Sequence, residues 1–292
     1  MLGCGVTSPS MREFDRFGPW IDEVRSAEDV PRLYRDAGLD PTACLLVLKV
    51  PRNIERRDAH PGMHLYDYLL ALDHETLTVL ERRDDTYGTT RIPLDRIAAL
   101  QDSVRLLDGR LTIHRLDGPA VVVPYNGSAN APVRDLIRLI RRWYLPGEPA
   151  VGYAAPGKPA LSHRDTGLVT DYDRLIAEEP GMRLATVADR QVVTPISRLE
   201  QLWRRARPLT LHAAIIVADE RELQLIHRRD WFTRQSNDIS LARTVLPRAR
   251  LTGVQLIPHH RYVNIDVVTV NAGAVAIDLP VTAGSIAEDV FS

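Results

Sequence analysis

The sequence is poor in lysine and cysteine. Lys49 and Lys158 are the only lysines, and they stand beside 35 arginines. A G+C-rich coding sequence explains this imbalance without any function. Two cysteines, Cys4 and Cys44, are too few and too featurelessly placed for a disulfide framework or a cysteine metal site. The cysteine content therefore favours a reducing compartment, and we expect a cytoplasmic protein.

Long hydrophobic runs are also missing. A membrane-spanning helix needs roughly 20 consecutive apolar residues, whereas the run Ala120–Val123 is already ended by Pro124. The opening letters MLGC resemble a lipoprotein cleavage box, but no charged segment and no apolar segment precede them. We therefore expect a soluble protein without a transmembrane segment.

An excess of either charge is absent as well. The 292 residues include 37 basic and 38 acidic side chains, which gives a formal net charge of -1. Residues 1–148 carry 20 basic and 22 acidic groups, and the remainder carries 17 and 16. Neither half has the basic excess that attracts a polyanion, so a nucleic-acid partner is not expected. The length and the 45% hydrophobic content are typical of two globular domains.

Two stretches of the sequence resemble each other. The stretch LLALDHETLTVLERR begins at Leu69, and IIVADERELQLIHRR begins at Ile215, at an offset of 146. Further on, IPLDR aligns with ISLAR at an offset of 147, and PAVVVPY aligns with GAVAIDL at 154. Small insertions in turns would produce this drift between two copies of one domain. Chance similarity between two β-rich segments is the alternative.

The first half predicts a series of short strands followed by one helix. Alternating or apolar runs predict seven strands, at 44–50, 64–73, 76–82, 89–94, 97–107, 110–115 and 119–125. Two Asp-Gly pairs, at 108–109 and 117–118, predict hairpin turns between the last three strands. Apolar residues at helical spacing then predict an amphipathic helix over 131–145.

The second half follows the same plan. It predicts strands at 209–219, 222–229, 249–257, 262–270 and 273–279 and a short closing helix at 285–292. Further helices are expected ahead of each sheet, at 27–38 and 170–181. The stretch between the halves is rich in proline and glycine and is interpreted as a linker.

A run of about seven antiparallel strands closed by one helix resembles the pleckstrin-homology-like fold. That fold is a bent barrel whose C-terminal helix closes one open end. Here the predicted helix VRDLIRLIRRWYL, which contains Trp143, follows the last predicted strand, PAVVVPY, in the same order. The expected fold class is α+β, mainly β, with two tandem barrels. The expected boundaries are an aromatic arm at 1–26, a first domain at 27–146, a linker at 147–165 and a second domain at 166–292.

The resemblance implies a binding scaffold, so we expect a non-catalytic adaptor whose partner is a protein or a small ligand. It also implies that lipid headgroups would bind to basic residues on the first hairpin loop. Lys49, Arg52, Arg56 and Arg57 fall in such a loop. Glu55 and Asp58 are interspersed, and we favour an ordinary solvated loop over a headgroup site.

Two arginine pairs recur at the end of the repeated hairpin. Arg82 and Arg83 in the first copy correspond to Arg228 and Arg229 in the second. Neighbouring residues of a strand point to opposite faces, so each pair would present guanidinium groups on both sides. Ion pairs with the acids of the turn explain them structurally, and binding of a partner is the functional alternative.

The N-terminal arm concentrates aromatic residues outside both predicted cores. Phe17 and Trp20 in REFDRFGPWIDEV are candidate anchors for a partner, because aromatic side chains dominate binding energy at interfaces. The structural alternative is that the arm packs back on the first domain and closes an edge of its sheet.

No catalytic residue, cofactor or metal is predicted. The sequence has no G-x-S-x-G, H-E-x-x-H, G-x-G-x-x-G or phosphate-loop motif. His259 and His260 with His227 and Asp266 suggest a metal site, but adjacent strand residues point apart and cannot bind one ion. A hydrolase or transferase with an unmarked site between the domains is the first alternative function. A structural subunit with a long unpaired strand edge is the second.

Overall fold

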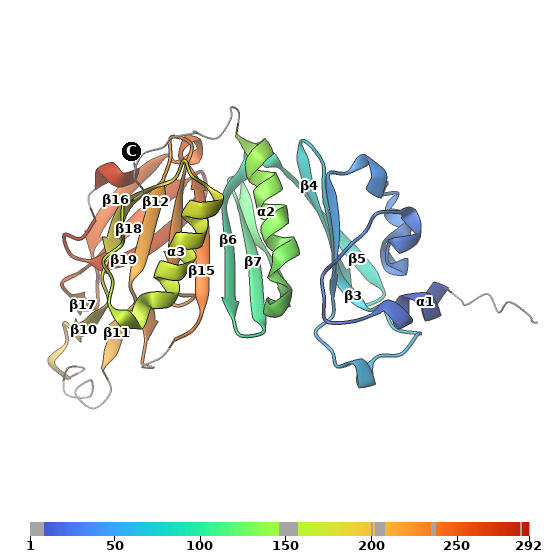
Figure 1. Ribbon diagram of the computed structural model, residues 1–292, viewed down its shortest axis with the longest axis horizontal. Coiled ribbons are helices and arrows are strands. Elements are labelled where there is room, and N and C mark those ends of the chain that lie inside the picture. The colour runs from blue at the N-terminus through green and yellow to red at the C-terminus, as the bar shows by residue number, and fades with distance from the viewer. Residues whose placement is uncertain are drawn as a thin grey trace, which may run out of the picture. The chain divides into compact units, whose positions relative to one another are not determined.

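The computed structural model describes residues 9–145, 157–199, 201, 208–234, 238–286 and 288–291 (Figure 1). The chain is mainly β, and its strands form antiparallel sheets, none of which closes into a barrel over the described residues. Its longest α-helices in these ranges include α1 (Pro9–Arg16), α2 (Asn130–Tyr144) and α3 (Thr166–Glu178). Backbone contacts divide the chain into two compact units, which are described separately below.

Unit 1 contains residues 1–96 with 107–109 and 123–144. Its five-stranded sheet runs in chain order through β1 (Asp22–Glu23), β2 (Leu46–Pro51), β3 (Tyr66–Leu72), β4 (Thr76–Arg83) and β5 (Thr86–Pro93). Neighbouring strands pair antiparallel, and the inner strands β2 and β3 are mostly apolar and buried along nearly their whole length.

One face of this sheet packs against the N-terminal arm and two short 3-10 helices, Ala27–Asp29 and Arg32–Ala37. Tyr34 and Leu69 are fully buried in the resulting cluster. The helix predicted over 27–38 therefore forms as two separate 3-10 segments, because Pro31 lies between them.

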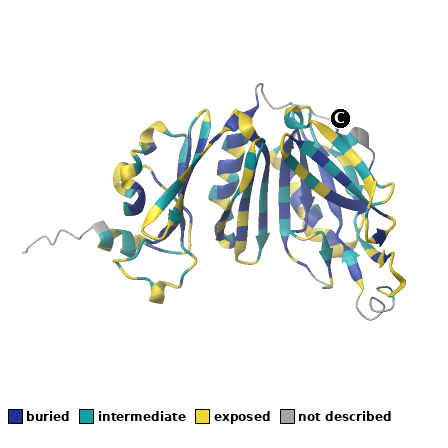
Figure 2. Cartoon of the chain, turned by 180° about the vertical axis from the view of Figure 1, so that it is seen from behind, coloured by how far each residue is buried: buried dark blue, intermediate teal, exposed yellow. Residues whose placement is uncertain are grey.

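Helix α2 forms where the apolar periodicity predicts it. Asn126 caps the short 3-10 turn that precedes it, and Pro132 lies in the first turn, where its missing N–H has no helical partner to lose. Its buried side chains are spaced three or four residues apart, and Figure 2 shows the alternation of buried and exposed positions along it. These side chains are Val133, Leu136, Ile137, Ile140 and Tyr144.

Unit 2 contains residues 97–106, 110–122 and 145–292. Its largest sheet has seven strands in the order β8-β7-β6-β15-β13-β12-β9. The bounds are β6 (Ile97–Arg105), β7 (Asp108–Arg115), β8 (Gly118–Asn126), β9 (Arg183–Ala188), β12 (Ala214–Ala218), β13 (Glu222–His227) and β15 (Leu241–Pro247).

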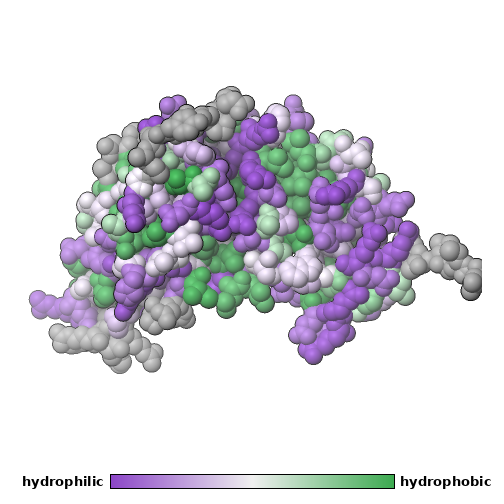
Figure 3. Space-filling view, viewed as in Figure 1, coloured by the Kyte–Doolittle hydropathy of each residue, from purple (hydrophilic) through white to green (hydrophobic). Residues whose placement is uncertain are grey.

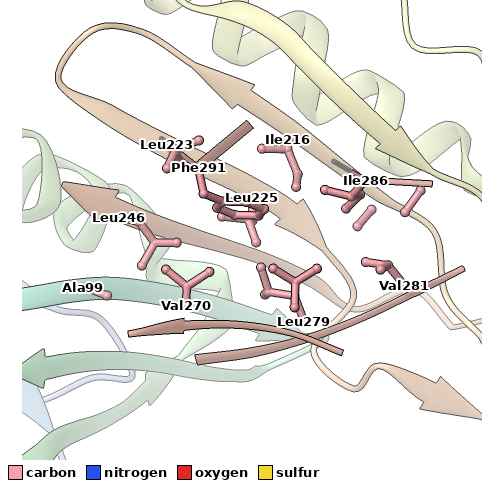
Figure 4. Packing of buried hydrophobic residues seen from close by; sticks show 13 residues of the cluster. Ala99, Ile216, Leu223, Leu225, Leu246, Val270, Leu279, Val281, Ile286 and Phe291 are labelled. Atoms are coloured by element: carbon pink, nitrogen blue, oxygen red, sulfur yellow. The ribbon is translucent and has the colours of Figure 1, made fainter. Parts of the chain in front are cut away.

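Two smaller sheets complete unit 2. One has the order β14-β11-β10-β17, and the other has the order β16-β18-β19. The bounds are β10 (Gln191–Pro195), β11 (Leu209–Leu211), β14 (Phe232–Thr233), β16 (Gly253–Pro258), β17 (Tyr262–Val263), β18 (Ile265–Ala272) and β19 (Val275–Thr282). Figure 4 shows Leu225, Leu246, Val270 and Leu279 pointing into the core between the large sheet and β18-β19. The closing segment is a 3-10 helix, Glu288–Phe291.

The compact units differ from the predicted domains, because residues 97–106 and 110–122 of the first half lie in unit 2. Residues 97–105, which the sequence places in the first half, pair with β15 of the second half in the register Leu100↔Val245 to Val104↔Leu241. The two halves therefore share a continuous sheet, and β6 belongs to unit 2. No single-strand pattern reveals a pairing between residues this far apart in sequence. Of the predicted linker, residues 147–156 lie outside the described residues.

The repeated hairpin folds alike in both places. Asp73 accepts backbone N–H bonds from residues 75 and 76 through its Oδ1 at 2.8 and 2.7 Å, and Asp219 accepts the equivalent bonds at 2.8 Å each. The strand after each hairpin pairs so that Pro93 lies opposite Thr76 and Pro247 lies opposite Glu222. Pro93 and Pro247 are 154 residues apart. The alignment of IPLDR with ISLAR at an offset of 147 is therefore wrong, because IPLDR corresponds to the end of β15.

The turns around β7 differ in position from the Asp-Gly prediction. The β6-β7 turn is Leu106–Leu107, with Leu106 at φ 55°, so Asp108 and Gly109 already belong to β7. Gly109 is needed for a close approach, because a Cβ there would lie 2.5 Å from the ring of Tyr125. Strands β9, β10 and β15 were not predicted, because polar residues interrupt their apolar pattern.

Candidate functional site

The N-terminal arm packs on unit 1. Phe17 is 5% exposed and meets the ring of Tyr66 edge-on at 6.2 Å between centroids. Asp22 and Glu23 form β1 and pair with Lys49 and Leu48, so the arm provides the edge strand of the sheet. This geometry agrees with the structural alternative for Phe17. Trp20 differs, because its side chain is 54% exposed.

The arginines of the first hairpin loop are engaged within the chain. Arg52 donates to the carbonyl of His64 at 3.2 Å, and Arg56 donates to the carbonyl of Phe17 while lying 4.5 Å above the ring of Phe14. Arg57 pairs with Glu55 at 2.8 Å. Arg56 thus fastens the loop to the arm. A headgroup would have to displace these contacts.

The two arginine pairs at the hairpin ends have different environments. Arg82 pairs with Asp67 of β3 at 2.8 Å, and the exposed Arg83 approaches Glu81 at 4.0 Å. Neither bridge involves the turn acids that the sequence suggested. Arg228 is 5% exposed and donates to the carbonyl of Ser240 at 2.7 Å, so it lies inside unit 2 rather than at a binding surface.

Arg229 also holds strands together. Its Nη2 donates to the carbonyl of Ser103 on β6 at 2.9 Å, and its backbone N–H bonds the Ser240 hydroxyl. The recurring arginines are therefore not equivalent in the two copies, and they do not converge on one site.

A small cavity lies in unit 1, where α1 meets the sheet. It has a volume of about 70 Å³, which is room for a few water molecules or one small ion. Figure 3 shows hydrophilic residues gathered over this part of unit 1. The lining side chains are mostly charged: Arg12, Glu13, Arg16, Glu28, Asp29, Val30, Arg35, Lys49 and Tyr66.

Lys49 is the most unusual member of this lining. It interrupts the apolar strand β2, is 7% exposed, and holds its Nζ 5.2 Å from the centroid of the Tyr66 ring. No carboxylate lies within ion-pair distance of it among the described residues. A buried ammonium that lacks a carboxylate is costly, because an aromatic face compensates only part of the lost hydration.

Tyr66 adds a hydrogen-bond donor to the same cavity. Its hydroxyl is buried and has no hydrogen-bond partner among the described residues. Burial raises the pKa of this hydroxyl, and the nearby carboxylates of Asp22 and Glu13 raise it further. The group therefore keeps its proton at neutral pH and is available to donate.

The rest of the lining leaves the cavity with a surplus of positive charge. Arg16 and Asp29 neutralise each other at 2.8 Å, and Glu13 accepts a backbone N–H from Arg32 at 2.9 Å. Arg35 donates to the carbonyl of Val30 at 3.2 Å. Four basic residues face three acidic ones, so the arrangement is suited to a small anion.

The sequence indicated only part of this cavity. The sequence places Lys49 in the basic first hairpin loop, whereas the structure places it in β2, and the sequence does not single out Tyr66, Arg12 or Arg35. The available signal was a lysine within an apolar strand of a chain that otherwise uses arginine. The spacing of residues in the sequence does not show that α1, the 3-10 helices and β2 come together around one cavity.

A histidine–aspartate pair of the kind that many active sites use lies in unit 2. His212 Nε2 is 3.3 Å from Asp238 Oδ2, but the two side chains are only 0% and 2% exposed. Burial lowers the pKa of His212, and Arg190 lowers it further. Arg105 also pairs with Asp238, at 3.2 Å. A reactant has no access to this pair, which therefore acts as part of a buried ionic network.

The histidine pair at 259–260 does not have the geometry that the sequence suggested. These residues follow β16 in a bend, and their rings stack at 4.8 Å instead of pointing to opposite faces. His227 is buried in β13 and stacks on Trp231. Among the described residues, no group of three or more potential ligands is placed to hold a metal ion.

His227 makes unit 2 sensitive to acid. Its Nδ1 donates to the carbonyl of Arg228 at 2.7 Å, so its Nε2 accepts from the Thr244 hydroxyl at 2.9 Å in the neutral ring. Burial lowers the pKa of His227 to about 4. Because this folded-state pKa lies below the unfolded value of about 6.5, stability is present above pH 6.5 and is lost as the pH falls toward 4.

We expect this titration to remove about 2 kcal/mol of unfolding free energy between pH 7 and pH 5. Urea denaturation at both pH values measures the loss, and the His227→Gln variant provides the comparison. The variant should lose about 2 kcal/mol less than the parent over this interval, whatever its stability at pH 7. An equal loss in both proteins would show that His227 does not titrate on unfolding.

Comparison with models of protein families, with curated proteins and with solved structures finds no match. Among the described helices, none is long and apolar enough to cross a membrane.

Proposed function

We propose that the chain is a non-catalytic binding protein that takes a small oxyanion, a carboxylate or a phosphate, into the Lys49 cavity. The observation that carries the proposal is the largely buried Lys49 on the cavity wall, without a carboxylate at ion-pair distance among the described residues. An oxyanion would supply the missing opposite charge. It would also accept a hydrogen bond from the Tyr66 hydroxyl.

The position of the cavity supports a role in recognition. Arg12 and Arg16 belong to α1, so the N-terminal arm forms one wall while β2 and β3 form the opposite one. A ligand in the cavity would contact the arm and the sheet at the same time. We infer that binding stabilises the docked arm, because a ligand that binds only the folded state adds its binding free energy to stability.

The domain plan is part of the same proposal. We propose that the two halves are diverged copies of one pleckstrin-homology-like domain in a cytoplasmic adaptor whose natural partner is a protein with an anionic group. Strands β2 to β8 with α2 follow the same order as β9, β12, β13, β15, β16, β18 and β19 with the closing 3-10 helix. The identical Asp73 and Asp219 turns support this correspondence.

Calorimetric titration of the full chain with inorganic phosphate and with acetate tests the site. We expect saturable binding of at least one anion by the parent protein and at least a tenfold weaker affinity in the Lys49→Met variant, which keeps the length of the side chain and removes its charge. The Tyr66→Phe variant should weaken binding about fivefold, as expected for loss of one hydrogen bond.

Lys158→Met is the matched control, because it removes the only other lysine, which lies outside unit 1. Its affinity should equal that of the parent. Binding that survives in Lys49→Met, or the absence of binding of both anions by a folded parent, would contradict the proposed oxyanion site.

A further inference from the structure

The strands β6 and β15 pair with each other, whereas their counterparts in the repeat each have one unpaired edge in the described sheets. In the repeat, β15 corresponds to β5 and β6 corresponds to β16, both at the offset of 154 that relates Pro93 to Pro247. In the described sheets β5 and β16 are terminal strands, whereas β6 and β15 pair with each other. Each chain thus contains one completed contact and the two separate halves of a second one.

We propose that the β16 edge of one copy pairs antiparallel with the β5 edge of a second copy of this chain, in the register of the β6-β15 ladder. Transferring that register places Gln255 opposite Thr90 and Ile257 opposite Gly88. The contact is between different surfaces, so one copy keeps its β5 edge free and the other keeps its β16 edge free. Such a head-to-tail contact propagates beyond a dimer.

The side chains at the centre of the register support this pairing. In the ladder within the chain, Gln101 Nε2 donates to Thr244 Oγ1 at 3.2 Å across the two strands. The corresponding residues on the two free edges are Gln255 and Thr90, which are the same residue types. Directly opposite side chains on one face of a sheet are close enough to form this bond again.

The central parts of the two edges also lack the features that keep exposed strands from pairing, and Arg91 and Pro258 lie at the ends of the proposed ladder. Charged residues and prolines commonly protect such edges. Residues 86–90 and 253–257 contain neither. Ile257 is 52% exposed on β16, and an opposing strand would cover part of it. Pro258 follows and lacks an N–H donor, so we expect the ladder to end at residue 257.

The backbone N–H groups of β5 that point away from β4 would form the proposed contact between copies. They identify a variant that should remove this contact and leave the fold of the chain unchanged. The two-residue turn Asp84–Asp85 is closed by the pair Arg83↔Thr86, which exchanges both backbone hydrogen bonds in such hairpins. Alternation then directs the N–H groups of residues 88 and 90 toward β4 and that of Thr89 outward. The Thr89→Pro variant therefore removes one outward donor and keeps the bonds to β4.

Sedimentation velocity of the full chain over a series of concentrations is the first test. We expect the weight-average mass of the parent to rise with concentration past that of a dimer, and Thr89→Pro to remain monomeric with an unchanged thermal midpoint. A parent that stays monomeric at the highest concentration, or a folded Thr89→Pro that associates as the parent does, would overturn the proposal.

Cysteine cross-linking tests the register itself. In a background with Cys4→Ser and Cys44→Ser, the pair Thr90→Cys and Gln255→Cys should give a ladder of disulfide-linked multimers under mild oxidation. The matched control pairs Thr90→Cys with Thr252→Cys, an exposed position three residues away. The control should give at least fivefold less of the multimers. Equal ladders, or disulfides only within single chains, would show that the proposed register is wrong.

This assembly is independent of the oxyanion site. Lys49→Met should bind no phosphate or acetate and still associate as the parent does, whereas Thr89→Pro should bind the anion as the parent does and remain monomeric. The two proposals can therefore fail separately.

Discussion

Replacing Phe17 with alanine is expected to lower the free energy of unfolding by about 3 to 5 kcal/mol, as deletion of a buried phenylalanine ring commonly does. The ring is 5% exposed and lies edge-on to Tyr66 within the cluster that covers one face of the unit 1 sheet. Its loss removes apolar burial and leaves a cavity beneath the arm. Urea denaturation followed by circular dichroism measures the effect.

The neighbouring aromatic residue supplies the control. Trp20 is 54% exposed, so Trp20→Ala should change the unfolding free energy by less than about 1 kcal/mol. A large loss in Trp20→Ala, or a negligible one in Phe17→Ala, would mean that the arm does not pack as described. If Trp20→Ala also lost an otherwise reproducible protein partner, it would be a docking anchor.

The Asp165→Asn variant is expected to destabilise the protein by about 3 to 5 kcal/mol, because it leaves Arg190 as an uncompensated buried charge. Asp165 has a fully buried side chain and accepts from Arg190 Nε at 3.1 Å and Nη2 at 2.8 Å. This bidentate pair connects the start of α3 to the loop between β9 and β10. Thermal and urea denaturation both report the loss.

The folded-state pKa is lowered for both Asp165 and His227, but by different causes. Burial alone would raise the pKa of Asp165, but hydrogen bonding and attraction from Arg190 outweigh it, and the pKa is lowered. The folded-state pKa thus lies below the unfolded value. The stabilisation is present above the unfolded pKa and is lost as the pH falls through the folded one, so Asp165→Asn should flatten the acid limb of the stability curve.

An exposed ion pair provides the comparison for Asp165. Asp135 pairs with Arg138 on α2 at the same distance of 2.8 Å, but both side chains are more than half exposed. Asp135→Asn should cost less than about 1 kcal/mol because solvent screens the pair. Similar losses in the two variants would contradict the burial argument for Asp165.

Local sequence patterns predicted the elements of the first half well. Strands β2 to β8 and helix α2 lie close to their predicted positions, because each carries its own alternation or helical periodicity. The predicted Asp-Gly turns lie one to two residues too late, since Leu106 adopts φ 55° and Gly109 is reserved for contact with Tyr125. Turn position depends on such packing as much as on the turn residues.

The arrangement of these elements was less accessible. Pairing of β6 with β15 and the meeting of Lys49 with α1 both join residues that are far apart in sequence, and neither leaves a mark on local spacing. The aromatic arm was recognised as unusual, but its burial follows from a partner surface that the sequence does not describe. Arg228 and Arg229 share a repeat position with Arg82 and Arg83, yet of these four arginines only Arg228 is buried.

The shared sheet also affects how the protein is made. Strand β6 leaves the ribosome well before β15, which begins at Leu241, and at typical translation rates the interval is on the order of ten seconds. During that time an aggregation-prone backbone edge has no cover from its eventual neighbour. Pairing of β6 with β15 therefore becomes possible only after most of the chain has been synthesised.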